Sequence, residues 1–171
     1  MYEGYWKDIG TIRSFWETNL SLTDPVPEFS FYDRDIQIYT HMRYLPPSKI
    51  NACALDRCLL SEGCVVSGKH IRHSIIGIRA VVGEGTVIED SVIMGADDYE
   101  WGPSAAGQPA VGIGRNCVIK QAIVDKNCRI GNDCYISPEG KDGDVSTDLY
   151  TVRDGVIVIP KNTVIPDGTR L

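Results

Sequence analysis

The sequence has no long apolar run and no excess of positive charge. Apolar residues make up 43% of its 171 residues, yet no run of them approaches the length of a membrane span. The formal net charge of -6 argues against nucleic acid or an anionic membrane as the main partner, because both select basic surfaces. The first residues also lack the charged start and apolar core of a secretory signal, so we expect a cytoplasmic protein.

Closely spaced cysteine pairs are absent as well. The six cysteines stand at positions 53, 58, 64, 117, 128 and 134, and no two of them form a C-x-x-C pair. This spacing disfavours a disulfide framework or a metal site. We therefore expect all six to be buried, reduced thiols.

A repeat of about six residues dominates the chain from Ile50 onward. Aliphatic residues recur every five or six positions, with Gly, Asn and Asp between them, which fits neither an amphipathic helix nor an alternating strand. A period near six is typical of a short strand followed by a corner, and three such units make one turn of a triangular coil. The aliphatic positions of the repeat are Ile71, Ile76, Val82, Ile88, Ile93, Ile113, Ile119, Val124, Ile130 and Ile136.

Equivalent positions of this repeat lie 17 residues apart, as Ile71 and Ile88 do. The pattern predicts an all-β fold, a left-handed parallel β-helix built from hexapeptide repeats, in which the handedness is what is known of the repeat class and does not follow from the spacing. Cys117 and Cys134 have the same separation, so we expect them to stack inside the coil. Four to five coils are expected over residues 50–171.

Several segments do not carry the repeat. Residues 96–110 and 137–155 are polar and rich in Gly and Pro, so we expect loops that leave a corner of the coil. Residues 22–49 contain prolines and aromatics and predict an extended strap, lying along the coil or against a neighbouring domain. Before the strap we expect a helix with Thr11 as a possible N-cap. One face of that helix carries Ile12, Phe15, Trp16 and Leu20.

Long motifs in a fixed order give the sequence a resemblance to a known family. They read YWKDIGT, FYDRDIQIYTHMRYLPPSKI, HSIIGIR, SVIMGADDYE, VGIGRNCVIKQAIVDKNCRIG and GVIVIPKNTVIPDGT. Together they resemble the C-terminal portion of the glucose-1-phosphate adenylyltransferases, or ADP-glucose pyrophosphorylases, over essentially the whole chain. The resemblance implies transfer of an adenylyl group from ATP to glucose 1-phosphate, with release of pyrophosphate, as the supply step for glycogen or starch.

The same resemblance divides the chain into three regions. Residues 1–21 are expected to be the last segment of the nucleotidyltransferase catalytic domain, residues 22–49 the strap, and residues 50–171 a regulatory and oligomerisation β-helix. The family's Gly-rich nucleotide loop and its phosphate-binding Arg and Lys have no counterpart in this sequence. We therefore expect no adenylyltransferase activity from this chain alone. For the full-length enzyme the resemblance implies a homotetramer.

Two kinds of site residue follow from the resemblance. Asp8, in the W-x-D-[IV]-G-T motif, corresponds to a ligand of the catalytic Mg²⁺, and it is also placed to cap the following helix. Lys126 and Lys161 correspond to lysines that bind 3-phosphoglycerate or phosphate in photosynthetic members. Other branches use fructose 1,6-bisphosphate or fructose 6-phosphate, so the identity of the effector stays open. Arg115 shares their hexad position, each of the three preceding an Asn suited to a tight turn, but we favour a solvated charge there.

Other classes of function stay open as alternatives. Hexapeptide coils also form acyl-CoA-dependent acyltransferases with a His general base, and a zinc carbonic anhydrase with three His ligands. This chain has His41, His70 and His73, without an acidic cluster or an evident third converging His, so we disfavour catalytic or metal roles for them. A purely structural module and a related sugar nucleotidyltransferase of other specificity are the remaining alternatives.

Overall fold

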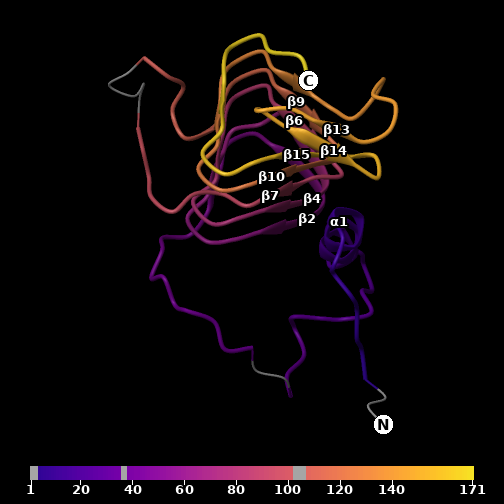
Figure 1. Cartoon of the computed structure of the whole chain (residues 1–171). Coiled ribbons are helices and arrows are strands. Elements are labelled where there is room, and N and C mark those ends of the chain that lie inside the picture. The colour runs from indigo at the N-terminus through magenta and orange to yellow at the C-terminus, as the bar shows by residue number, and fades with distance from the viewer. Residues whose placement is uncertain (1–3, 36–37, 102–106) are drawn as a thin grey trace.

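Short strands stacked in a three-sided coil form the main body of the chain (Figure 1). The structure is a computed structural model that describes residues 4–35, 38–101 and 107–171. The strands are β1 (Lys49–Ile50), β2 (Ala54–Leu60), β3 (Val65–Val66), β4 (His70–Ile76), β5 (Val81–Val82), β6 (Val87–Glu89), β7 (Val92–Ile93), β8 (Gly112–Ile113), β9 (Val118–Lys120), β10 (Ala122–Val124), β11 (Arg129–Ile130), β12 (Tyr135–Ile136), β13 (Val145–Ser146), β14 (Thr151–Arg153), β15 (Val156–Ile159) and β16 (Val164–Ile165).

The sides of the coil are formed by two sheets. One is a six-stranded sheet in the order β1-β3-β5-β8-β11-β16, with parallel pairing throughout. The other bends around a corner, because the first half of β4 pairs with β6 and its second half pairs with β7. His73 lies at that bend with a φ of 45°, a left-handed conformation that is uncommon for a residue other than Gly.

Many of the corners use the Asn residues that the sequence places there. Asn116, Asn127 and Asn162 have φ values of 54°, 60° and 63°. Asn tolerates the left-handed region better than most residues, because its short polar side chain can bond locally to the backbone. The expected tight turns after Arg115, Lys126 and Lys161 are therefore present.

Columns of inward aliphatic side chains form the core. In the register of the parallel strands Ile71 lies opposite Ile88, Ile88 opposite Ile119, and Ile119 opposite Ile136, and all four are fully buried. Ile113 likewise lies opposite Ile130. Neighbouring parallel strands are about 4.8 Å apart, so like side chains contact like along the axis. The predicted stacking of the six-residue repeat is confirmed.

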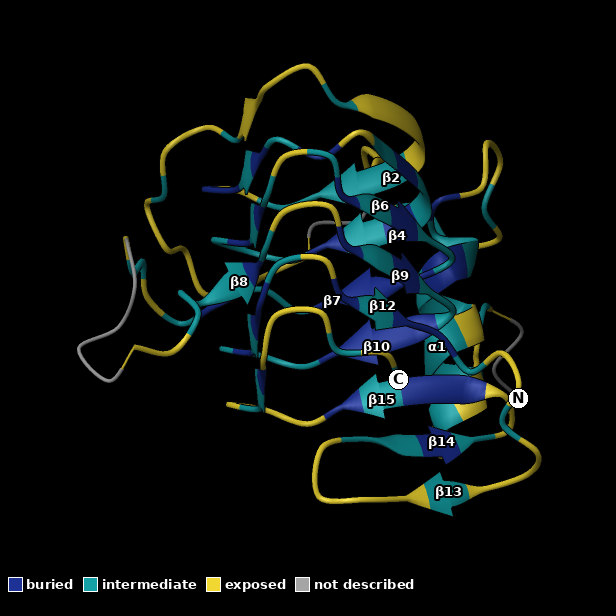
Figure 2. Cartoon of the chain, turned by 90° about the horizontal axis from the view of Figure 1, so that it is seen from above, coloured by how far each residue is buried: buried dark blue, intermediate teal, exposed yellow. Residues whose placement is uncertain are grey.

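Helix α1 (Ile12–Ser21) covers the outside of one face of the coil. Thr11 is its N-cap, with a reciprocal pair of bonds in which Ser14 N–H donates to Thr11 Oγ1 and Thr11 N–H donates to Ser14 Oγ. The predicted apolar face of the helix packs on outward side chains of β7, β10 and β15. Figure 2 shows these three strands largely in dark blue, because the core lies on one side and α1 on the other. The residues in this contact are Ile12, Phe15, Trp16, Leu20, Val92, Ile123 and Val156.

The segments outside the repeat differ in part from expectation. Within residues 137–155 the chain forms strands β13 and β14, and β14 pairs antiparallel with β15, where only a loop was expected. Val152 of β14 is buried, which gives this hairpin a packing contact of its own. The coil is also longer than the expected four to five layers on one face, where six strands stack.

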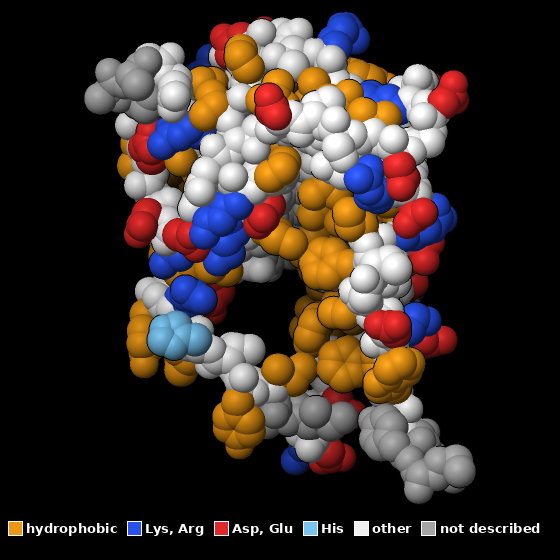
Figure 3. Space-filling view, viewed as in Figure 1, with side chains coloured by type: hydrophobic (Ala, Val, Ile, Leu, Met, Phe, Trp, Pro, Cys, Tyr) orange, Lys and Arg blue, Asp and Glu red, His pale blue; other side chains and the backbone are white. Residues whose placement is uncertain are grey.

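The strap does not lie along the coil. Figures 1 and 3 show it standing off the strands, with an open gap between them. None of its described residues between 22 and 48 is in a helix or strand, and aromatic side chains such as Tyr39 are 86% exposed. Among its described residues, only those near its ends contact the coil, through Asp24 with Arg57 and through Pro46 and Ser48. The alternative that the strap lies against a neighbouring domain stays a prediction. In the described part of the chain, no helix combines the length and apolar character needed to cross a membrane.

Four of the six cysteines are buried, whereas the sequence predicted burial of all six. All six are free, and Cys117 and Cys134 are buried in neighbouring layers, as expected from their spacing. Burial raises the pKa of Cys117 to about 11, and it raises the pKa of Cys128 to about 11 as well. Cys53 and Cys58 are only partly buried, because they lie in the first coil, which has no coil below it.

Shortening one residue of an inward column should destabilise the coil strongly. We expect Ile119→Ala to lower the free energy of unfolding by about 3 kcal/mol, because it leaves a cavity between two fully buried neighbours. Urea unfolding followed by circular dichroism would measure this loss. The exposed corner substitution Glu84→Ala is the control, with an expected change below about 0.5 kcal/mol. Similar small losses in both variants would contradict the stacked core.

Candidate functional site

Lys126 and Lys161 lie on one edge of the coil, in adjacent layers. The strands on either side fix their register, because Val124 lies opposite Ile159 and Ile130 lies opposite Ile165. Asn162 N–H also donates to Lys126 O at 3.0 Å across the corner. The sequence alone left it open whether the two lysines share an edge. The parallel register on both sides brings them together.

Both ammonium groups contact the same carboxylate, that of Asp97. Lys126 Nζ is 2.9 Å from Asp97 Oδ1, and Lys161 Nζ is 3.0 Å from Asp97 Oδ2. Asp97 follows β7, in the layer next to Lys126, at the start of the loop over residues 97–111. Asn127 holds it there, since Asp97 N–H donates to Asn127 Oδ1 at 2.8 Å and Asn127 Nδ2 donates to Asp97 Oδ2 at 3.0 Å.

The electrostatics of this corner favour the charged form of Asp97. Lys126, then Asn127 and then Lys161 hold the pKa of Asp97 well below its usual range, because all three donate to the charged form of the carboxylate. The three side chains in the ion pairs are partly open to solvent, with exposed fractions of 31% for Lys126, 47% for Lys161 and 40% for Asp97. Solvent can therefore reach the carboxylate and both ammonium groups.

Another cation, Arg129, pairs with the loop that begins at Asp97. Arg129 Nη1 donates to Glu100 Oε1 at 2.7 Å and to the carbonyl oxygen of Pro109 at 2.9 Å, so it holds both ends of the loop. The ion pair lowers the pKa of Glu100. A cavity of about 310 Å³ is lined by this ion pair and by Asp97. Its lining includes Asp97, Tyr99, Glu100, Asn127, Arg129 and Asn162.

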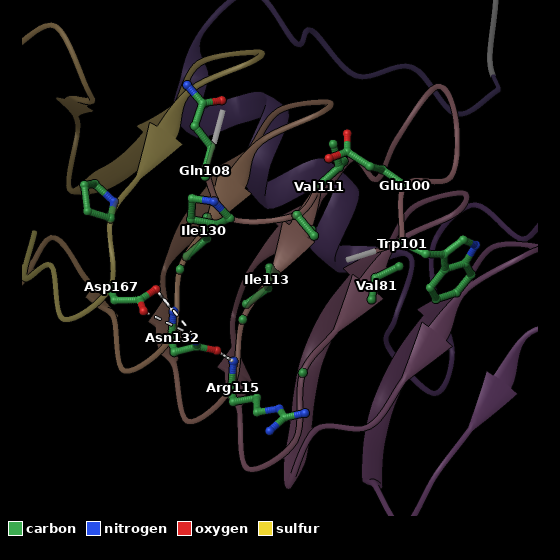
Figure 4. A pocket seen from close by; sticks show the side chains of 18 residues that line it. Val81, Glu100, Trp101, Gln108, Val111, Ile113, Arg115, Ile130, Asn132 and Asp167 are labelled. Atoms are coloured by element: carbon green, nitrogen blue, oxygen red, sulfur yellow. Dashed lines mark hydrogen bonds between the residues drawn. The ribbon is translucent and has the colours of Figure 1, made fainter. Parts of the chain in front are cut away.

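Arg115 does not join this group. It lies at another corner, where its N–H donates to Asn132 Oδ1 at 2.9 Å, and Asn132 N–H in turn donates to Asp167 Oδ1 at 2.8 Å. Figure 4 shows these three residues along one side of a groove of about 600 Å³, with Glu100 and Trp101 on the other side. Arg115 itself is exposed.

Comparison with known proteins decides the family. The sequence model of the GLGC left-handed parallel β-helix domain matches residues 43–170. The chain belongs to this family. It is also 42% identical, over an alignment of 177 residues, to the glucose-1-phosphate adenylyltransferase small subunit, chloroplastic/amyloplastic, of Triticum aestivum. That alignment covers 99% of this chain and 37% of the wheat protein, so the chain spans a little over a third of the length of this relative.

Membership of the GLGC β-helix family confirms the fold and the resemblance inferred from the motifs. The matched region begins at residue 43, within the strap, whereas we placed the start of the β-helix at residue 50. The division of the chain at residues 21 and 49 stays a prediction. So does the cytoplasmic location, since the wheat relative is named as chloroplastic or amyloplastic.

Asp8 offers a single carboxylate for a metal. It is exposed, and its Oδ1 accepts a hydrogen bond from Gly10 N–H at 2.9 Å. It does not cap the helix, because Thr11 fills that position. Across the residues that the structure describes, no group of three or more His, Cys, Asp or Glu side chains is arranged to hold a metal ion. Asp8 fits Mg²⁺ in donor type, but the described residues do not complete a coordination shell.

The histidines lie outside the lysine corner. His73 Nδ1 is 2.6 Å from Asp90 Oδ1 in the next layer, and Arg72 reaches the other oxygen of the same carboxylate at 3.3 Å. His41 is exposed on the strap. These contacts give His73 a partner within the coil itself.

Removing either lysine should raise the pKa of Asp97 toward its ordinary value of about 3.9, because each ammonium stabilises the charged carboxylate. We expect Lys126→Gln to raise it more than Lys161→Gln, since Lys126 is the larger cause. A pH titration of the Asp97 side-chain carboxyl by ¹³C NMR measures both. Lys69→Gln, an exposed charge at another corner, should leave the titration unchanged. Equal effects of all three variants would show that only net charge matters.

Proposed function

We propose that this chain is the regulatory and assembly region of a glucose-1-phosphate adenylyltransferase. In this proposal the full-length enzyme forms ADP-glucose and pyrophosphate from ATP and glucose 1-phosphate, with Mg²⁺, in glycogen or starch synthesis. Family membership over residues 43–170 and the likeness to the wheat small subunit support it. Asp8 would supply one oxygen ligand to Mg²⁺, an ion that usually takes one or two protein carboxylates and keeps several waters.

We further propose that the Lys126–Lys161 edge binds a phosphorylated metabolite of the 3-phosphoglycerate or phosphate class. The observation that carries this proposal is that the two ammonium groups meet on one carboxylate, each bonded to a different oxygen. Two ammonium groups a few ångströms apart repel each other by roughly 1 kcal/mol even in water, and an anion between them reverses the sign. Phosphate oxygens form strong, charge-assisted hydrogen bonds with such groups.

Phosphate and 3-phosphoglycerate at millimolar concentration should perturb the NMR signals of Lys126 and Lys161. The double variant Lys126→Gln/Lys161→Gln should weaken phosphate binding by at least about tenfold, because two charge-assisted hydrogen bonds are lost. Arg115→Gln is the matched control: it removes a positive charge that follows the same sequence pattern at another corner, so binding should stay as in the unmodified chain. Phosphate binding that is equally tight in the double variant and in the unmodified chain would exclude this edge as the effector site.

The assembly role is supported by apolar surface at one end of the molecule. The first coil leaves Ile50 and Leu55 each 40% exposed, and the strap leaves Tyr32 83% exposed and Tyr44 85% exposed. An open end of a repeat coil needs a cap or a partner, because its apolar side chains and strand edge otherwise face water. We propose that this end contributes to contacts between subunits of a homotetramer.

Light scattering tests the assembly role. At tens of micromolar we expect a mass above the 18.9 kDa of a single chain, and Leu55→Lys should lower the associated fraction by placing a charge on the first coil. Leu149→Lys is the control, because Leu149 has nearly the same exposure, 38% against 40%, but lies in the loop between β13 and β14. A chain that stays monomeric at every concentration would rule out assembly through this end.

A further inference from the structure

Asp97 occupies the place that an effector anion would take. It accepts one hydrogen bond from each lysine, at 2.9 and 3.0 Å, through its two separate oxygens. We infer that Asp97 is an internal counter-anion, and that a phosphorylated effector binds by displacing its carboxylate from Lys126 and Lys161. This inference rests on the proposed effector site and adds the means of its regulation.

The loop that begins at Asp97 offsets part of the positive charge of the corner. Asp97 pairs with the two lysines, and three residues later Glu100 pairs with Arg129. With Asp97 in place, the lysine pair offers only one net positive charge. A doubly charged phosphate gains the full attraction of both ammonium groups only after the carboxylate has left, because otherwise it faces a like charge at contact distance.

Displacement of Asp97 requires little of the rest of the structure. Its side chain is 40% exposed, so rotation about its own side-chain bonds takes the carboxylate into solvent. The backbone before it remains tied to the coil, since Ala96 N–H donates to Ile78 O at 2.9 Å. The bonds that are lost are those to the two lysines and to Asn127 Nδ2, and the incoming phosphate replaces them with its own oxygens.

The segment that follows Asp97 contacts the coil close to the end of the strap. Tyr99, two residues after Asp97, donates its hydroxyl to Gly63 O at 2.8 Å. Gly63 N–H donates to Pro46 O at 2.8 Å, at the point where the strap joins the coil. Loop, coil and strap thus meet at Gly63, and the position of the Asp97 carboxylate is the two-state element that an effector biases.

Inorganic phosphate is the probe, and the 171-residue chain is the protein. We expect Asp97→Asn to bind phosphate about three- to tenfold more tightly than the unmodified chain, because the internal competitor has lost its charge while its shape is kept. Asp98→Asn is the matched control: it removes the same charge one residue away, from an exposed side chain. It should change the affinity by less than about twofold.

A second readout follows the displacement itself. In the unmodified chain, saturating phosphate should move the NMR signals of the Asn127 side-chain amide toward their positions in phosphate-free Asp97→Ala, because Asn127 Nδ2 loses the same partner in both cases. Asn127 signals that stay in place while phosphate binds would show that the carboxylate does not leave.

The outcomes separate this inference from the effector site itself. If phosphate binding depends on the two lysines but Asp97→Asn and Asp98→Asn have equal effects, Asp97 is not a competitor and only the inference is overturned. If neither the unmodified chain nor Asp97→Asn binds phosphate through the lysines, the effector site is overturned as well.

Discussion

The parallel register of the inward aliphatic columns is the constraint on which the other features depend. Each layer repeats the last, with Ile71 over Ile88 on one side and Ile113 over Ile130 on another. A slip of one residue would turn the column outward, so the core fixes the register strongly. Once it is fixed, residues at the same corner of successive coils must lie on one edge, whereas Arg115, which holds the same place in a hexad on another side, lies at another corner. The proximity of Lys126 and Lys161 is thus a by-product of hydrophobic stacking.

The coil also explains why the side chain of Asp97, at the start of a loop, lies accurately at that edge. The loop over residues 97–111 leaves after β7 and returns at β8, and both strands keep their parallel partners. Its first residues therefore start from a fixed corner, one layer from Lys126. Arg129 bonds to Glu100 near one end of the loop and to Pro109 near the other. The described residues near the two ends of this loop are thus placed by the register of the strands beside them.

Features that depend on the period of the sequence were predicted correctly. Contacts between the coil and segments that lack its period were not. The columns, the helix with its Thr11 cap and the apolar face of α1 all follow from local spacing. Pairing of Asp97 with the lysines does not, because a loop has no period that relates it to the coil. The outward residues Val92, Ile123 and Val156 hold a signal that the repeat obscured: they are apolar at positions that would otherwise face water, and α1 covers them. The position of the strap had no comparable signal.

The edge that carries the two ammonium groups already holds an anion in the structure, the Asp97 carboxylate. Lys126 and Lys161 belong to adjacent layers whose spacing the core sets, so the two cannot relieve their repulsion by moving the backbone apart. Solvent screens the repulsion between the two ammonium groups only in part. A carboxylate bonded to both offsets that repulsion through its charge and through directed hydrogen bonds. A chain of net charge -6 has more acidic than basic side chains, so carboxylates are available for this role. In the proposed mechanism, an outside anion therefore acts at this edge by exchange with the Asp97 carboxylate.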